Sequence, residues 1–252
     1  MAATPVADRM DVVRAEIRDP LRELITHLRA GLGDNLKSVT AVGSCLTEDF
    51  HPRSSDINTV VVVERHDLVV LDAVAGLTRP MARRRLAPPV LMTPAYIDRS
   101  RDVFGVEFLD FQLTHETIFG ADPFASLAIG KPAVRLQCER ELKAMLMRLR
   151  QGYIAASGEK KAVHELLVGT AKGLVPLARA LLWLKDLWRP KTMPEALRAV
   201  AQEFKMDLNE VIAVGQNRHE KHRPTDAEVE ATFVNVVAAV ELLTAIVDQL
   251  EL

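Results

Sequence analysis

The sequence is poor in cysteine and in net charge, and each shortage narrows what the protein can be. Its two cysteines, Cys45 and Cys138, are too few for a disulfide framework and fit a reducing cytosol. A formal net charge of −2 gives no support for a strongly basic surface, so no nucleic-acid partner is expected. The N-terminal segment MAATPVADRMDVVRAE lacks the apolar core of a signal peptide, which predicts a cytoplasmic protein.

Long uninterrupted apolar runs are also missing. The most apolar late segment, residues 234–247, carries Glu241 in its middle and is short for a bilayer, which needs about 20 apolar residues. Membrane association is therefore not expected. The chain has 252 residues, of which 48% are hydrophobic and 26% charged, and this composition is ordinary for a soluble protein with one large domain or two smaller ones.

The first half of the chain alternates between helical and extended patterns. Apolar spacing predicts helices over residues 7–32 and from His66 to Arg85. Runs of β-branched and apolar residues predict strands on either side of a loop at 45–55, and further strands over Pro88–Thr93 and Phe104–Phe111. The expected fold class is α/β (α+β), with a mixed sheet and flanking helices over residues 1–130.

From residue 131 to residue 252 the pattern becomes helical and predicts a bundle domain of four or five helices. Thr225 and Glu228 form a predicted capping box at the start of the last helix. The apolar positions of that helix recur at spacings of four and three, which favours a bundle helix. The same spacing leaves open a coiled coil between two chains, and hence a homodimer through the helical domain.

The chemistry is concentrated between Ser38 and Glu64. An apolar run ends at Gly43 and Ser44, an eleven-residue loop follows, and Asp56-Ile57-Asn58 opens a second β-branched run. Alternation along a strand places Asp56 and Asn58 on one face. A turn of phosphate size followed by two oxygen ligands suits a complex of Mg²⁺ with a triphosphate.

This pattern resembles the signature of the nucleotidyltransferase superfamily of the DNA polymerase β type, which includes antibiotic and minimal nucleotidyltransferases. In that family a Gly-Ser pair precedes an Asp-x-Asp or Asp-x-Glu on the next strand. The resemblance covers residues 39–119, and the helical tail matches in general architecture. It implies that Gly43 and Ser44 hold the β- and γ-phosphates of a nucleoside triphosphate, most often ATP, and that Asp56 ligates two Mg²⁺ ions.

The family also has a third acid on a later strand, which completes the metal site and helps to deprotonate an acceptor hydroxyl. The resemblance implies that Glu107 takes this catalytic and metal-binding role, because it lies between the apolar residues Val106 and Phe108. Asp110 is the alternative. On a regular strand the two acids would point to opposite faces, so only one could serve.

Position 58 departs from the family pattern because Asn58 stands where the second acid would be. Its amide oxygen is a Mg²⁺ ligand without charge, whereas hard divalent ions favour carboxylates. Two hypotheses follow. The first is an enzyme that transfers a nucleoside monophosphate from Mg-NTP to a hydroxyl group of a small molecule or a protein. The second is a catalytically degenerate nucleotide-binding or interaction module, including half of a toxin–antitoxin pair.

A cluster of arginines lies at the end of the second predicted helix, between Arg79 and Arg85. Contact with phosphate or nucleic acid is one interpretation. A solvated helix end, where cations are favoured, is the preferred one.

Overall fold

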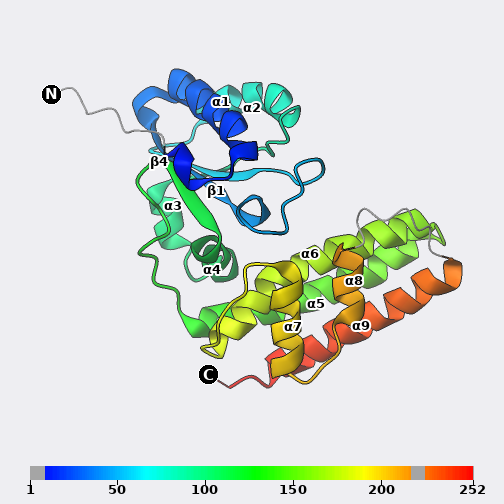
Figure 1. The fold of residues 1–252 in the computed structure, drawn as a ribbon. Coiled ribbons are helices and arrows are strands. Elements are labelled where there is room, and N and C mark those ends of the chain that lie inside the picture. Colours follow the sequence, from blue (N-terminus) through cyan, green and yellow to red (C-terminus); the bar gives the residue numbers. More distant parts are fainter. Residues whose placement is uncertain (1–8, 217–224, 252) are drawn as a thin grey trace. The chain divides into compact units, whose positions relative to one another are not determined.

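The structure is a computed structural model that describes residues 9–216 and 225–251 (Figure 1). The described chain divides into two compact units. The first comprises residues 9–101 and Phe108–Ala128. The second comprises Asp102–Glu107 and the described residues from Ile129 onward.

The first unit contains a four-stranded sheet in the order β3-β2-β1-β4. β1 pairs antiparallel with both β2 and β4, whereas β3 is parallel to β2, so the predicted mixed sheet is confirmed. Valine and threonine dominate the two central strands because β-branched side chains pack well on a pleated surface. The strands are β1 (Leu36–Val42), β2 (Asn58–Val63), β3 (Val90–Met92) and β4 (His115–Gly120).

Two helices and one face of the sheet form the core of this unit. α1 (Ala15–Leu32) buries apolar residues at helical spacing, and α2 (Leu68–Ala82) contributes Val70, Val74 and Met81 to the same core. The strands supply their alternate residues to it, among them Val39, Val61 and Val63. The predicted helices are confirmed over Ala15–Leu32 and Leu68–Ala82. The first prediction began too early, because Met10–Val12 form a separate 3-10 helix, and positions 7 and 8 lie outside the described residues.

The predicted strand over Phe104–Phe111 is wrong, because these residues form the start of α4 (Gly105–Leu113), which follows the short α3 (Pro94–Arg99). Short apolar runs fit a strand and a buried helix equally well. Here tertiary packing favours the helix. Phe108 and Phe111 lie one helical turn apart, and their ring centroids are 6.2 and 5.1 Å from that of Phe124.

The second unit is a helical bundle, as predicted, with five helices in its described part. Thr225 and Glu228 form the predicted capping box. The apolar stripe of α9 is largely buried within the chain, where α9 packs on α5 and α6, while the homodimer stays a prediction. The helices are α5 (Lys131–Ala156), α6 (Lys160–Leu184), α7 (Met193–Glu203), α8 (Asn209–Gln216) and α9 (Asp226–Asp248).

α6 and α9 are both long and apolar enough to cross a membrane by length and composition. α9 passes this test because the helix extends well beyond the apolar run at residues 234–247. Most of the apolar window of α6 is buried inside the bundle, as in the core helix of a soluble protein. α9 carries exposed charges that pair with α5, namely Glu241 with Arg150 at 2.8 Å and Asp248 with Lys143 at 2.9 Å. The expectation of a cytoplasmic protein without a membrane partner stays a prediction.

Candidate functional site

The Gly43–Ser44 turn leaves the end of β1 as a short 3-10 helix over Gly43–Leu46. Gly43 has a φ of +80°, a conformation that only glycine adopts without strain. Its N–H donates to the carbonyl of Thr114 at 2.9 Å. The fully buried Cys45 donates through Sγ to the carbonyl of Val42 at 3.4 Å. The turn is therefore fixed from two directions, and the side chain of Ser44 is exposed.

Asp56 and Asn58 lie beside this turn. Both are exposed, and between them the buried Ile57 bridges to Leu86, so the two polar residues share one face as the sequence predicted. Asn58 is the register partner of Val42. Because Val42 immediately precedes the turn, the structure brings Gly43 and Ser44 next to the start of β2.

Arg85 holds the segment that leads into Asp56. Its Nε and Nη1 donate to the carbonyls of Ser55 and Arg53 at 2.9 and 2.7 Å, and its Nη2 lies 3.6 Å from Oδ1 of Asp56. Arg85 itself follows α2 and has a φ of +61°. The preferred interpretation of the arginine cluster as a solvated helix end is wrong for this residue, which partly offsets the charge of Asp56.

The two candidates for the third acid lie on α4 rather than on a strand. Spaced by three residues on a helix, Glu107 and Asp110 share a face, the reverse of the expectation for a strand. Glu107 belongs to the second unit, where Gln137 of α5 donates to its carboxylate at 2.6 Å. Gln137 also accepts from the backbone N–H of Val106 at 2.9 Å. Glu107 as the third acid, with Asp110 as the alternative, stays a prediction. The argument that the two acids point to opposite faces of a strand no longer applies, because both lie on a helix.

The sequence gave no indication of a histidine–aspartate pair at the start of β4. His115 Nε2 lies 2.9 Å from Oδ2 of Asp122, and the other oxygen of Asp122 accepts from the N–H of Phe124 at 2.9 Å. Although burial raises the pKa of Asp122, the hydrogen bonds from His115 and Phe124 outweigh it, and the pKa lies below its usual value. Had the segment HETIFG (His115–Gly120) been predicted as a strand, His115 would have been expected at the edge of the sheet.

The donor set of the first unit fits one Mg²⁺ ion better than two. Within the described residues, no group of three or more His, Cys, Asp or Glu side chains is arranged to hold a metal. Asp56 and Asn58 offer a carboxylate and an amide oxygen on one face, and Mg²⁺ is commonly held by one or two carboxylates together with substrate phosphates and water. The pair therefore suits an ion that arrives with a triphosphate, and a second ion would need the predicted third acid.

Neither cysteine is suited to nucleophilic catalysis, because both thiols are buried. Burial raises the pKa of Cys45 to about 11 and that of Cys138 to about 12, so the reactive thiolate is scarce at neutral pH. We expect almost no labelling of the native protein by a maleimide at pH 7.5, and two labels per chain in guanidinium. Rapid labelling of Cys45 in the native protein would contradict the buried turn.

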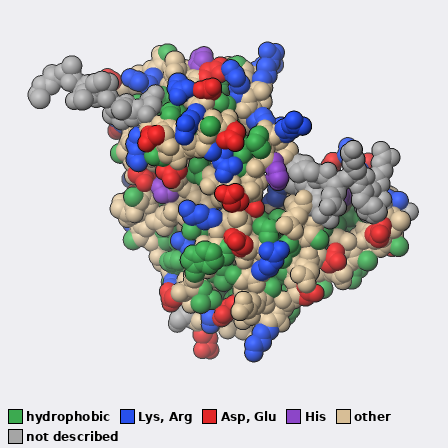
Figure 2. Space-filling view, in the orientation of Figure 1, with side chains coloured by type: hydrophobic (Ala, Val, Ile, Leu, Met, Phe, Trp, Pro, Cys, Tyr) green, Lys and Arg blue, Asp and Glu red, His purple; other side chains and the backbone are tan. Residues whose placement is uncertain are grey.

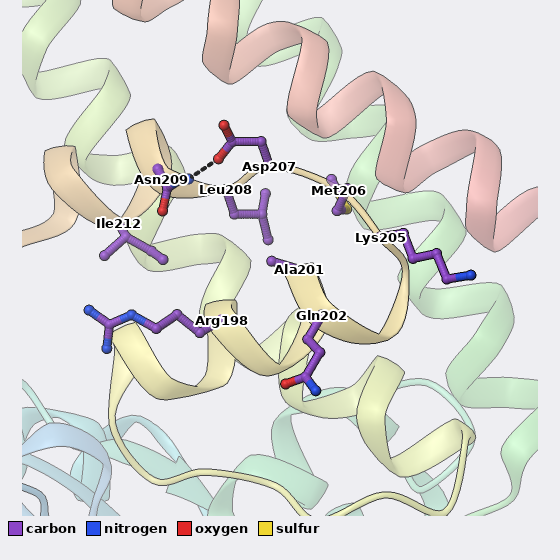
Figure 3. A pocket seen from close by; sticks show the side chains of 9 residues that line it. All are labelled: Arg198, Ala201, Gln202, Lys205, Met206, Asp207, Leu208, Asn209 and Ile212. Atoms are coloured by element: carbon purple, nitrogen blue, oxygen red, sulfur yellow. Dashed lines mark hydrogen bonds between the residues drawn. The ribbon is translucent and has the colours of Figure 1, made fainter.

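The second unit has a hollow of about 350 Å³ between α7 and α8 (Figure 3). Arg198, Gln202 and Lys205 on its rim are exposed to solvent. Asp207 accepts a hydrogen bond from the backbone N–H of Asn209 at 2.8 Å and so supports the start of α8. These polar groups do not match the pattern of a phosphate turn or metal pair, so the candidate site is the one in the first unit.

Charges of both signs are interspersed on the molecular face shown in Figure 2. Lysine and arginine side chains alternate there with aspartate and glutamate instead of gathering in a basic stripe. The expectation that nucleic acid is not the partner stays a prediction.

The comparisons with known proteins show the fold. No family model and no curated protein matches the sequence. The structure is similar to the crystal structure of spectinomycin adenyltransferase AAD(9) from Enterococcus faecialis with ATP and spectinomycin, with a TM-score of 0.56 and 13% identity. The match covers 88% of this chain and 98% of that chain. The predicted fold, a nucleotidyltransferase-like sheet with helices followed by a helical domain, is confirmed.

Proposed function

We propose that the protein binds a nucleoside triphosphate, in the first instance ATP, with Mg²⁺, and transfers its nucleoside monophosphate to a hydroxyl group of a small molecule. The observation that carries the proposal is the register of β1 and β2. It places the exposed Asp56 and Asn58 beside the turn at Gly43, whose positive φ glycine adopts without strain. The structural neighbour was solved with ATP and spectinomycin, which supports ATP as donor and a small molecule as acceptor.

Each polar group of the site has a role in this proposal. Backbone N–H groups of the turn and the hydroxyl of Ser44 bind the β- and γ-phosphates, and Gly43 permits their close approach. Asp56 and Asn58 would hold Mg²⁺, which would offset part of the phosphate charge. Glu107, or Asp110 in its place, is the predicted third acid for a second ion.

Arg85 adds a fixed positive charge to this site. Its two hydrogen bonds to backbone carbonyls hold the guanidinium in place independently of its ion pair with Asp56. Arg85 would therefore keep its place, and could contact phosphate, if Asp56 bound a cation. Arginine suits this role because its planar group stays charged and pairs well with phosphate oxygens.

A second candidate function is nucleotide binding without transfer. The neutral Asn58 favours it, because stabilising the developing charge of phosphoryl-type transfer depends on firmly held cations. Arg85 already offsets part of the charge of Asp56, which further weakens the pull on a metal. In this form the protein would act as a nucleotide-dependent interaction module, for example as half of a toxin–antitoxin pair.

The substitution Asn58→Asp separates the two candidates. Restoring a carboxylate is expected to tighten Mg²⁺-dependent ATP binding and to raise pyrophosphate release about tenfold, since about 1.4 kcal/mol of added cation binding corresponds to that factor. Calorimetry and a pyrophosphate assay with hydroxylated small molecules measure both. Asn235→Asp, at an exposed position of α9, is the matched control.

The outcomes are distinct. Turnover by the wild type, increased in Asn58→Asp, supports the enzyme. Binding by both, with turnover only in Asn58→Asp, supports the module without transfer. Absence of ATP binding in both variants, with Mg²⁺ and with Mn²⁺, would refute both candidates.

A further inference from the structure

His115 occupies the same end and face of the sheet as the proposed nucleotide site. Val42 is the register partner of Asn58 on one side and of His115 on the other. Directly paired residues of antiparallel strands project to the same face, and strands lie about 4.8 Å apart. The two side chains therefore flank β1, from which the Gly43–Ser44 turn emerges, and their Cα atoms are on the order of 10 Å apart.

Asp122 fixes the orientation of the His115 ring. With its pKa below the usual value, Asp122 is ionised at neutral pH and only accepts hydrogen bonds. The proton between the two side chains therefore lies on Nε2, and in the tautomer that carries only this proton the lone pair is on Nδ1. The ring of Phe124 packs at its edge with a centroid distance of 5.7 Å, and the His115 side chain keeps 15% of its surface exposed.

The strand on the other side of β2 does not supply a base. β3 consists of Val90, Leu91 and Met92, and the residues of β2 after Asn58 are threonine and valine. The predicted acid Glu107 is instead hydrogen-bonded to Gln137 in the second unit. Among the strand residues on this face of the sheet, His115 is the one with the chemistry to accept a proton at neutral pH.

We propose that His115 is the general base of the nucleotidyl transfer and that Asp122 is its positioning residue. This inference rests on the proposed function. The oxygen of the acceptor hydroxyl attacks the α-phosphorus while its proton passes to Nδ1 of His115. The new oxygen–phosphorus bond forms as the bond between the α-phosphorus and the bridging oxygen breaks, and pyrophosphate leaves with that electron pair. The proton then passes from His115 to solvent.

The test compares His115→Gln, Asp122→Asn and Glu107→Gln with the wild type. His115→Gln is expected to lower kcat by about 10²- to 10⁴-fold, the usual effect of losing a general base. Its affinity for Mg-ATP and its melting temperature are expected to change little. Asp122→Asn should lower kcat at least tenfold, because an amide at this position can stabilise the other tautomer. Glu107→Gln tests the rival base: its kcat can fall through the predicted metal site, but the acid limb of its pH profile is expected to remain as in the wild type.

The pH profile of kcat distinguishes a general base from a residue whose hydrogen bond to Asp122 only stabilises the fold. Two described side chains contact His115. Asp122, which forms the hydrogen bond, is charged, and Phe124, which packs on the ring, is uncharged. The wild-type kcat should fall on the acid side, because a base that already carries a proton cannot accept one from the acceptor hydroxyl, and this limb should disappear in His115→Gln.

Three results would overturn the inference. One is full turnover in His115→Gln while the wild type is active. The second is a parallel fall in ATP affinity and in melting temperature in His115→Gln, which would indicate that His115 only stabilises the fold. The third is a loss of turnover and of the acid limb in Glu107→Gln alone. Failure of the proposed function looks different: the wild type then binds ATP without turnover, or does not bind it, and the base assignment falls with it.

Discussion

Replacing Asp56 with alanine is expected to lower pyrophosphate release at least 100-fold and to remove the Mg²⁺ dependence of ATP binding. Asp56 is the carboxylate beside the Gly43–Ser44 turn, and Asn58 alone offers one neutral oxygen to the ion. The substitution also releases Arg85 from its ion pair. The freed guanidinium can attract phosphate directly, so residual ATP binding should be equally strong with and without Mg²⁺.

Asp98→Ala is the matched control, because Asp98 is also an exposed aspartate of the first unit paired with an arginine, Arg101, at 3.1 Å. Exposed ion pairs contribute about 1 kcal/mol or less, so both variants should melt close to the wild type. Measurements of pyrophosphate release and of ATP binding, with and without Mg²⁺, then separate the role of Asp56 in the site from the general effect of losing an exposed ion pair. Equal turnover in Asp56→Ala and Asp98→Ala would remove Asp56 from the mechanism.

Replacing Gly120 with alanine is expected to destabilise the first unit by about 3 kcal/mol or more, the range in which backbone strain and overpacking combine. Gly120 ends β4 with a φ of +78°, and a Cβ built there would lie 1.9 Å from the carbonyl oxygen of Lys37. Because that oxygen belongs to β1, the clash is relieved only by moving one strand. Urea unfolding followed by circular dichroism measures the loss.

Gly76→Ala is the control for this substitution. Gly76 lies within α2, and an added Cβ there meets no atom within 4 Å. Alanine in a helix interior is expected to stabilise by about 0.5–1 kcal/mol relative to glycine. Gly120→Ala and Gly76→Ala should therefore shift the unfolding midpoint in opposite directions. A midpoint in Gly120→Ala equal to that of the wild type would contradict the close approach of β4 to β1.

The elements that the sequence predicted correctly carry strong local signals. β-branched residues and a polar loop identify β1, β2 and the turn between them, and the spacing of apolar residues identifies α1, α2 and the bundle helices. The capping box at Thr225 is likewise local, because both of its hydrogen bonds join residues three apart. These features are predictable because their signals come from residues that are close in the sequence.

The features that the sequence did not reveal depend on contacts between distant segments. FGVEFLDF becomes α4 because Phe108 and Phe111 pack on the ring of Phe124. β4 is short and begins with His115 and Glu116, so its strand pattern is weak, and its place in the sheet comes from pairing with β1. The neighbouring arginines are chemically identical, and only the fold selects Arg85 to bond the segment before Asp56.

We infer that the turn at Gly43 and the pair Asp56 and Asn58 bind a nucleoside triphosphate together with a divalent cation. Calorimetric titration of the wild-type protein with ATP, with and without Mg²⁺, tests this inference. The expected result is one saturable site per chain that is tighter with Mg²⁺ and loses this difference in Asp56→Ala. No binding of ATP with either Mg²⁺ or Mn²⁺, or binding whose Mg²⁺ dependence survives in Asp56→Ala, would contradict the claim.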